Sequence, residues 1–236
     1  MKFSFILLAH NEELTIKEEI ENLYNKIIKN FSDEYEVIIC EDGSADNTQK
    51  IIQEINKDYS FMHLTSSNRK GVSKAMLDAF SIAKGNYIFF TDAGKKFDFN
   101  NFWHLYEHIH NYDLVSGLRT NRKDQKYRIL LTYMFNLFLK LTVKSQFKDI
   151  DSGFKIFKKK CLNEILIKDP INTDFLSAEI CLKFQYKKYK FKEVNVEYFQ
   201  RNEISKALPS YKIPSLIFRF LKNFKLLKRE LNSYSN

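Results

Sequence analysis

Short apolar runs alternate with amphipathic stretches through the first half of this chain, and this rhythm restricts the fold more than any other feature of the sequence. In the helix-like stretch 12–30, for example, Ile16, Ile20 and Leu23 fall on one face. Unbroken apolar runs are typical of strands covered on both faces. The sequence therefore predicts an α/β fold, with a mostly parallel sheet and helices on both faces. Strands are expected at 3–9, 35–40, 61–65, 87–91 and 113–117, and helices at 12–30, 46–57 and 72–84.

Length and composition indicate a folded domain with a basic surface. A chain of 236 residues fits one large domain, or one domain with a modest extension. The formal charge of +9 favours anionic partners such as nucleotides, nucleic acid or phospholipids, although a lysine-rich solubilising surface would explain it as well. The three cysteines show no CxxC spacing, and neither a leader nor a membrane-spanning segment is evident. We expect reduced core cysteines in a cytosolic protein.

Polar residues stand at or just beyond the ends of four predicted strands. Ligands bind beyond the carboxyl ends of the strands in such sheets, so these residues should line one crevice. The four groups are His10-Asn11-Glu12, Glu41-Asp42, Asn68-Arg69-Lys70 and Asp92.

The segment 86–98 bears most directly on chemistry. Its apolar run leads into Asp92, and a carboxylate in that place can hold a divalent cation against a diphosphate. Enzymes of that type usually carry a second acid two residues later. This chain has Gly94 there, followed by Lys95 and Lys96.

The second half of the chain changes character. The expected elements are an aromatic-rich helix at 127–143, a turn and strand at 149–157, a helix at 173–186, a strand at 191–199 and an amphipathic helix at 215–231. In the last helix, Phe220, Phe224, Leu227 and Leu231 form an apolar side, and Lys222, Lys225 and Arg229 form a basic side. The first and last of these helices suit contact with an acidic membrane surface, packing into the core, or a homodimer interface.

In order and spacing, these motifs resemble those of the family 2 inverting glycosyltransferases, which have the GT-A fold with its Rossmann-like sheet. Within that family the chain is most similar to the branch that includes dolichol-phosphate mannose synthase and bacterial polyprenyl-phosphate sugar transferases. The resemblance implies a GT-A domain over 1–206 and a basic amphipathic helix within 207–236, at a membrane surface or an interface. It rests on Ala9-His-Asn-Glu12, Glu41-Asp-Gly-Ser44, 86–98, Gly117-Leu-Arg119, Asp151-Ser-Gly-Phe154, Arg201 and Ser205-Lys206.

The resemblance also implies a site for a nucleotide diphosphate sugar. Asp42 would contact the base or ribose, because a carboxylate accepts hydrogen bonds from hydroxyl and base N–H groups. Out of context, Glu41-Asp-Gly-Ser44 would fit a plain turn and helix cap better, but its place after a buried strand and beside three other polar strand ends favours the nucleotide site. The implied residues of this site are His10, Glu12, Glu41, Asp42, Lys70 and Asp92, with His10 and Glu41 in the places of the family's usual Tyr and Asp.

The implied metal site departs from the family's usual Asp-Ala-Asp-Gly-Gln pattern. Gly94 removes one carboxylate, and Lys96 replaces a neutral side chain. One hypothesis is that Asp92 alone holds Mn²⁺ or Mg²⁺ weakly, with diphosphate oxygens and water. The other is that Lys95 or Lys96 neutralises the leaving diphosphate and that no metal is required. A third reading leaves both lysines in solvent.

Enzymes of this branch pass the sugar to a polyprenyl phosphate, so the resemblance implies a site for the acceptor phosphate. Such an acceptor is already anionic and needs positioning and charge neutralisation more than a strong base. A hydroxyl acceptor would need a base, for which Asp98 and Asp151 are candidates. The candidate acceptor residues are Arg119, Arg122, Lys123, Arg128, Ser152, Arg201 and Lys206, and the candidate catalytic residues are Asp92, Lys96 and Arg119.

We therefore expect a hexosyltransferase that lies peripherally on the cytoplasmic face of a membrane. Two alternatives stay open: a transferase acting on an envelope-glycan hydroxyl, and a catalytically inactive binding protein that keeps the nucleotide-sugar fold. Nucleic acid is not an expected partner, because no recognition motif accompanies the charge. The sequence does not predict the donor's base and sugar or the oligomeric state.

Overall fold

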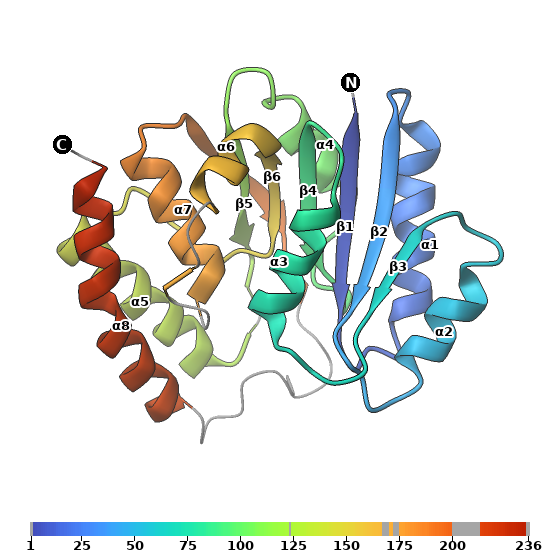
Figure 1. The fold of residues 1–236 in the computed structure, drawn as a ribbon, viewed down its shortest axis with the longest axis horizontal. Helices are drawn as coiled ribbons and strands as arrows, with labels where there is room; N and C mark the ends of the chain where they lie inside the picture. The colour runs from blue at the N-terminus through green and yellow to red at the C-terminus, as the bar shows by residue number, and fades with distance from the viewer. Residues whose placement is uncertain (1, 123, 167–169, 172–174, 200–212, 235–236) are drawn as a thin grey trace.

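A computed structural model of the chain describes residues 2–122, 124–166, 170–171, 175–199 and 213–234. At its centre lies one sheet with helices on both faces, as Figure 1 shows. In the described residues the sheet has seven strands in the order β3-β2-β1-β4-β6-β5-β7. The strands are β1 (Phe3–Ala9), β2 (Tyr35–Glu41), β3 (Met62–Thr65), β4 (Tyr87–Asp92), β5 (Leu114–Thr120), β6 (Phe154–Lys158) and β7 (Phe191–Glu197).

The strands are buried on both faces because alternate apolar side chains enter two separate cores. In β1, Phe5 and Leu7 pack into one core, and Ile6 and Leu8 into the other. The first core is closed by α1 (Ile16–Lys26), η1 (Ile28–Asn30), α2 (Thr48–Ile55) and α4 (Asn101–Tyr106). The second is closed by α3 (Val72–Ile82), α5 (Lys126–Val143), α6 (Lys159–Ile165), α7 (Leu176–Tyr186) and α8 (Ile213–Ser233).

The predicted α/β architecture is confirmed, and the predicted strands are present with small shifts at their ends. Two short helices, α4 and α6, were not predicted. The sheet also contains one reversal: β6 runs antiparallel to both β4 and β5, whereas the other neighbouring pairs are parallel. This reversed strand brings the loop before Phe154 to the edge where β4 ends.

The strand register places the predicted polar residues at one edge of the sheet. Ala9 pairs with Glu41, and Leu8 pairs with both Cys40 and Asp92. The last residues of β1, β2 and β4 are therefore level with one another. Together with the start of α3, they form the carboxyl edge on which the site is built.

The C-terminal helix packs into the protein interior through its apolar side. Phe220, Phe224, Leu227 and Leu231 are buried in the second core, so these four side chains are not free to meet a membrane. Phe220 and Phe224 contact aromatic rings of α5. The fully buried Lys183 of α7 also bonds Glu230 of α8 at 3.1 Å. The division into 1–206 and 207–236 stays a prediction.

None of the helices in the described part of the chain combines the length and apolar character needed to cross a membrane.

Candidate functional site

Two turns at the carboxyl edge, one after β1 and one after β2, are tied together by hydrogen bonds. The Nδ1 atom of His10 donates to the carbonyl oxygen of Asp42 at 2.8 Å. The amide of Asn11 donates to Oγ of Ser44 at 3.0 Å, and the amide of Glu12 to Oγ1 of Thr48 at 2.7 Å. His10 and Glu12 therefore help to shape the turns, and His10 keeps part of its surface exposed.

Glu41 and Asp42 are buried, and their carboxylates hold the surrounding backbone. Glu41 accepts hydrogen bonds from Oγ1 of Thr65 at 2.7 Å and from the amide of Ser44. Asp42 accepts from the amides of Lys70 at 2.7 Å and Gly71 at 2.9 Å, where α3 begins. Only 2% of Asp42 is exposed, and its carboxylate fixes the backbone just before the first residue of α3.

The turn containing Gly43 lies directly against the loop before α3. Gly43 has a φ of +58°, and a Cβ on it would lie 2.4 Å from the backbone nitrogen of Arg69. Only glycine permits this close approach. In that loop, the Lys70 ammonium bonds Asp78 at 2.7 Å, which raises the pKa of Lys70. Arg69 is exposed and makes no ion pair with any residue that the structure describes.

Asp92 and Lys96 form an ion pair at the end of β4. The ammonium nitrogen of Lys96 lies 3.3 Å from Oδ2 of Asp92, and both side chains are partly exposed. Lys95 turns the other way, towards Glu18 of α1, with which it forms a salt bridge. Of the two lysines named from the sequence, Lys96 is therefore the one that lies at the candidate diphosphate position.

The turn between Asp92 and Lys96 is held in place by a buried acidic residue that was not predicted from the sequence. Oε1 of Glu19 accepts a hydrogen bond from the amide of Lys95 at 2.9 Å. Burial raises the pKa of Glu19 to about 7, and the nearby carboxylate of Glu12 adds to the rise. An acid on the buried face of a helix was the available signal, but nothing in the sequence links it to the turn.

The loop before β6 closes the other side of Asp92. A Cβ on Gly153 would lie only 2.5 Å from Oδ2 of Asp92, so the backbone here touches the carboxylate. The loop is held by Lys155, whose buried ammonium donates to the carbonyls of Ile150 and Ser152 and to Oγ of Ser177. Lys155 is a second residue that sequence reasoning missed.

Asp151 lies in the same loop and keeps contact with solvent. The pKa of its carboxyl is nevertheless raised, chiefly through desolvation by the surrounding protein. The negative charges of Asp149 and Asp92 make smaller contributions to this rise. The positive charges of Arg119 and Lys155 oppose this rise. An exposed carboxyl in the loop that touches Asp92 is a candidate proton acceptor.

Arg119 is held in a buried ion pair with Asp149. Its Nε and one terminal nitrogen each lie 2.6 Å from a different oxygen of Asp149. Burial opposes both charges, but the pairing keeps the pKa of Asp149 below its usual range and that of Arg119 above it. Glu193 also accepts from the amide of Asp149 at 2.8 Å. The guanidinium of Arg119 thus fastens the 149–155 loop to β5.

The other proposed acceptor residues have different surroundings. Arg122 pairs with Asp124 at 2.7 Å and lies over the ring of Tyr198. Arg128, in the first turn of α5, makes no ion pair with the described residues. Ser152 is buried, and its Oγ has no hydrogen-bond partner in the described structure. Lys123, Arg201 and Lys206 lie outside the described residues.

Asp98 is held by hydrogen bonds to neighbouring residues of the fold. It accepts hydrogen bonds from the ammonium of Lys26 at 2.9 Å and from the amide of Asn100 at 3.0 Å, at the start of α4. Burial opposes ionisation, but these bonds keep the pKa of Asp98 below its ordinary value. Asp98 is therefore a weaker candidate for a base than Asp151.

The residues at Asp92 do not fit a divalent cation well. Gly94 brings no side-chain ligand, and the ammonium of Lys96 would repel a second cation beside the same carboxylate. No cluster of three or more His, Cys, Asp or Glu residues with metal-binding geometry occurs in the described parts of the chain. Mn²⁺ and Mg²⁺ prefer several oxygen ligands, and within the segment 92–96 only Asp92 supplies a carboxylate.

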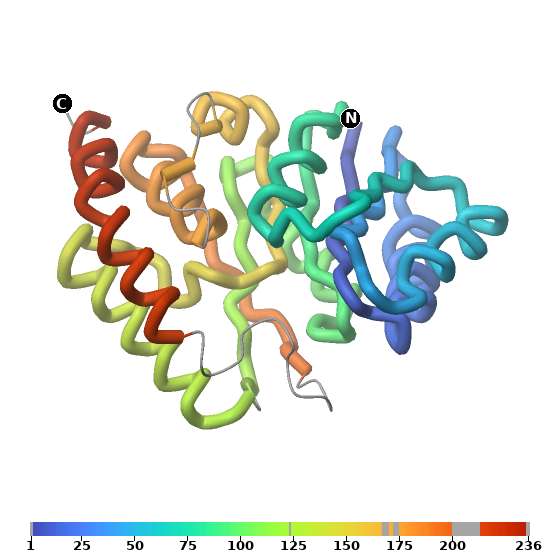
Figure 2. The backbone as a smooth tube through the Cα atoms, turned by 60° about the horizontal axis from the view of Figure 1, so that its bottom comes forward, coloured from blue at the N-terminus to red at the C-terminus, as the bar shows by residue number. Residues whose placement is uncertain are grey.

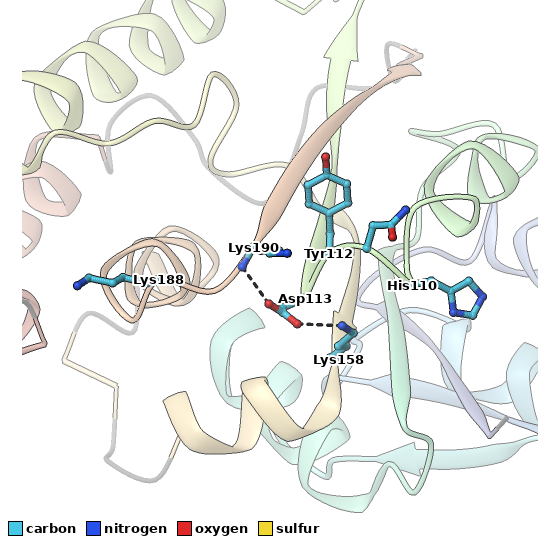
Figure 3. A pocket seen from close by; sticks show the side chains of 7 residues that line it. His110, Tyr112, Asp113, Lys158, Lys188 and Lys190 are labelled. Atoms are coloured by element: carbon cyan, nitrogen blue, oxygen red, sulfur yellow. Dashed lines mark hydrogen bonds and ion pairs between the residues drawn. The ribbon is translucent and has the colours of Figure 1, made fainter.

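A hollow of about 670 Å³ lies at the opposite edge of the sheet, as Figure 3 shows. There Asp113 bonds the ammonium of Lys158 at 2.9 Å and the amide of Lys190 at 2.9 Å. This hollow adjoins the first residue of β5, away from the carboxyl ends where ligands bind in such sheets. It is therefore separate from the candidate site.

The fold and the carboxyl edge define an α/β protein whose polar residues gather beyond the ends of its parallel strands. The sequence profile of the glycosyl transferase family 2 matches residues 4–166, which is more than half of the chain. The chain belongs to this family, and the resemblance stated from its motifs is confirmed.

Several relatives are named for lipid-phosphate acceptors. The chain is 25% identical over 181 residues to the dolichyl-phosphate β-glucosyltransferase of Dictyostelium discoideum, covering 69% of this chain and 55% of the relative. It is 24% identical over 168 residues to the undecaprenyl-phosphate 4-deoxy-4-formamido-L-arabinose transferase of Proteus mirabilis, covering 70% and 51%. The glycosyltransferase AglD of Haloferax volcanii is 25% identical over 207 residues, covering 84% and 33%. The chain thus spans between a third and just over half of these three relatives.

Solved structures share the fold. The glucosyl-3-phosphoglycerate synthase of Mycobacterium tuberculosis, in complex with Mn²⁺, UDP and phosphoglyceric acid, has a TM-score of 0.72 over 96% of this chain and 78% of its own. The sequence identity is 16%, so this likeness supports the GT-A fold alone.

Proposed function

We propose that this chain transfers a sugar from a nucleotide diphosphate sugar to a polyprenyl phosphate, with inversion at the anomeric carbon. The observation that carries the proposal is the ion pair between Lys96 and Asp92 at the carboxyl edge. It puts a fixed positive charge where a leaving diphosphate would lie in this fold. The family assignment, together with relatives named for dolichyl and undecaprenyl phosphate, supports the choice of reaction and acceptor.

The donor would lie across the two turns that Glu41 and Asp42 hold. In this arrangement the buried carboxylates act through the backbone they fix, and the exposed surfaces of His10 and Arg69 meet the nucleotide. An imidazole can stack on a base, and a guanidinium without a protein partner can pair with a phosphate.

Lys96 would take over the work of a metal ion. As the bond between the anomeric carbon and the diphosphate oxygen breaks, the leaving nucleotide diphosphate takes the bonding electrons, and the ammonium stabilises its growing charge. Asp92 holds that ammonium at the edge of the sheet instead of leaving it in solvent. A solved structure that shares the fold contains Mn²⁺ together with UDP. We propose that in this chain a side chain takes the place of the cation.

The acceptor's phosphate oxygen would attack the opposite face of the anomeric carbon. Being anionic already, it needs no base. Arg128 is the group best placed to bind it, because it has no ion pair within the described part of the chain, whereas Arg119 and Arg122 already have carboxylate partners. A polyprenyl chain lies in a bilayer, so we place the reaction at the cytoplasmic face of a membrane.

A second candidate function is transfer to a glycan hydroxyl, which is favoured by the exposed carboxyl of Asp151 in the loop whose Gly153 touches Asp92. Such an acceptor must lose a proton, and Asp151 would take it. The substitution Asp151→Asn separates the two functions, because it should abolish transfer to a hydroxyl while sparing transfer to a phosphate.

The test is a transfer assay with purified protein, labelled UDP-sugars and GDP-sugars, and EDTA, in which undecaprenyl phosphate in detergent and a soluble envelope glycan are both offered as acceptors. We expect a lipid-linked sugar product, reduced about a hundredfold or more by Asp92→Asn. Label on a soluble glycan but not on lipid would favour the second candidate. Nucleotide binding without any transfer would indicate a binding protein and contradict the proposal.

A further inference from the structure

The helices α5 and α8 expose an unusual share of the protein's large apolar side chains. Of the sixteen such exposed residues in the described parts of the chain, seven lie on α5 and four on α8. On α5 they include Leu141, which is 75% exposed, and Tyr133, which is 65% exposed; on α8, Phe218 is 70% exposed. A soluble monomer rarely leaves a patch of this extent uncovered.

These exposed residues do not lie on the helix faces that pack into the core. On α5, Leu130, Tyr133 and Leu137 recur at helical spacing on the outer face, whereas Leu139 and Val143 are buried. On α8, Phe218 and Leu221 lie outside the buried stripe. Figure 2 shows the two helices running side by side, and aromatic contacts between them join their inner faces.

The charge around this apolar surface is almost entirely positive. The sequences of α5 and α8 contain eight Lys and Arg residues, three on α5 and five on α8, and one acid, Glu230. Glu230 already pairs with the buried Lys183. Exposed Lys222 and Lys225 stand on the outer face of α8, close in sequence to Phe218 and Leu221. Mixed apolar and basic faces of this kind suit the boundary of an anionic bilayer.

We propose that the outer faces of α5 and α8 form a docking surface for an anionic lipid bilayer. We choose a bilayer over a protein partner because of this charge, and the choice also rests on the proposed function, whose acceptor lies in a membrane. Both helices start at the edge of the molecule towards which β1, β2 and β4 point, as Figure 1 shows. A bilayer held there would present lipid phosphates beside Arg128 in the first turn of α5.

Flotation with vesicles tests this surface. Purified protein is mixed with vesicles of phosphatidylcholine alone, or of equal parts phosphatidylcholine and phosphatidylglycerol. We expect binding to the anionic vesicles, weakened about tenfold by Leu130→Ser with Met134→Ser, and similarly by Lys222→Glu with Lys225→Glu. Matched controls are Leu14→Ser with Met62→Ser, both exposed elsewhere, and Lys50→Glu with Lys57→Glu on and just after α2. These should bind as the unaltered protein does.

Two further measurements separate an effect on vesicle binding from an effect on folding or on the transfer reaction. Each variant is checked by thermal unfolding and by nucleotide titration, neither of which the surface substitutions should change. Protein that binds nucleotide and transfers sugar in detergent, but ignores anionic vesicles, would overturn the docking surface and leave the proposed function standing. The protein could instead fail to bind vesicles and form a dimer in solution that is dissociated by Leu130→Ser with Met134→Ser. That result would assign the surface to a second copy of the chain and would also overturn the proposed bilayer contact.

Discussion

The ammonium of Lys96 lies 3.3 Å from the carboxylate of Asp92, so the end of β4 already holds a cationic group that belongs to the protein itself. A divalent cation would have to be recruited from solution, and it would repel this ammonium at the same carboxylate. The proposed role of Lys96 would also account for Gly94 at the position where the family's usual pattern has a second acid. A ligand for a metal is unnecessary if a lysine supplies the charge.

Gly153→Ala should disable the site by moving Asp92. The new Cβ would lie 2.5 Å from Oδ2 of Asp92, so the carboxylate must shift and release Lys96. A displacement near 1 Å can cost about a hundredfold in rate, and we expect a loss of that order in the transfer assay. Gly85→Ala is the control, because its Cβ would clash with Ser4 at the far end of the sheet. Comparable loss of turnover in the folded Gly85→Ala protein would contradict this explanation.

Glu19→Gln should change how stability depends on pH. The pKa of Glu19 is raised from 4.5 to about 7 in the folded protein, so its proton favours folding, and this contribution is full below pH 4.5 and lost as pH rises through 7. The substitution removes the charge and keeps an acceptor for the amide of Lys95. At pH 8 it should raise the free energy of unfolding by about 3 kcal/mol, with little change near pH 4.

Urea unfolding at several pH values measures this difference. The exposed Glu54→Gln serves as the control and should leave the profile unchanged. Parallel profiles for Glu19→Gln and the unaltered protein would show that the carboxyl titrates normally.

Arg119→Met should lower the free energy of unfolding, and this effect should exceed its effect on the binding of any ligand. It leaves Asp149 buried without its bidentate partner, and breaking such a pair costs about 3–5 kcal/mol. Lys50→Met removes an exposed pair with Glu54 and should cost about 0.5 kcal/mol or less. Denaturant unfolding compares the two. A cost below about 1 kcal/mol for Arg119→Met would show that Asp149 finds other partners.

The sequence predicted the fold because its signals are local. Apolar runs such as 3–9 mark buried strands, and the polar residues at their ends follow from strand direction, so Asp42 and Asp92 were placed at one edge correctly. The reversal of β6 was not predicted, because apolar periodicity carries no information on strand direction. The short helix α4 is a single apolar cluster that gives little helical period.

The partners of the site residues were harder to predict because they are distant in sequence. Arg119 and Asp149 are thirty residues apart, and no local pattern shows that they meet. Lys95 and Lys96 are adjacent and chemically alike, yet one bonds Glu18 and the other Asp92. The apolar stripe of α8 was predicted correctly, but burial in the core or contact with a membrane would give the same pattern.

Calorimetric titration of UDP and GDP into the protein, with EDTA and then with Mn²⁺, tests the central role of Lys96 most directly. We predict that one nucleotide binds in EDTA, and that Lys96→Ala weakens this binding about tenfold or more, while Lys95→Ala does not. Binding that requires Mn²⁺ and is indifferent to Lys96→Ala would contradict the account and return the cation's role to a metal at Asp92.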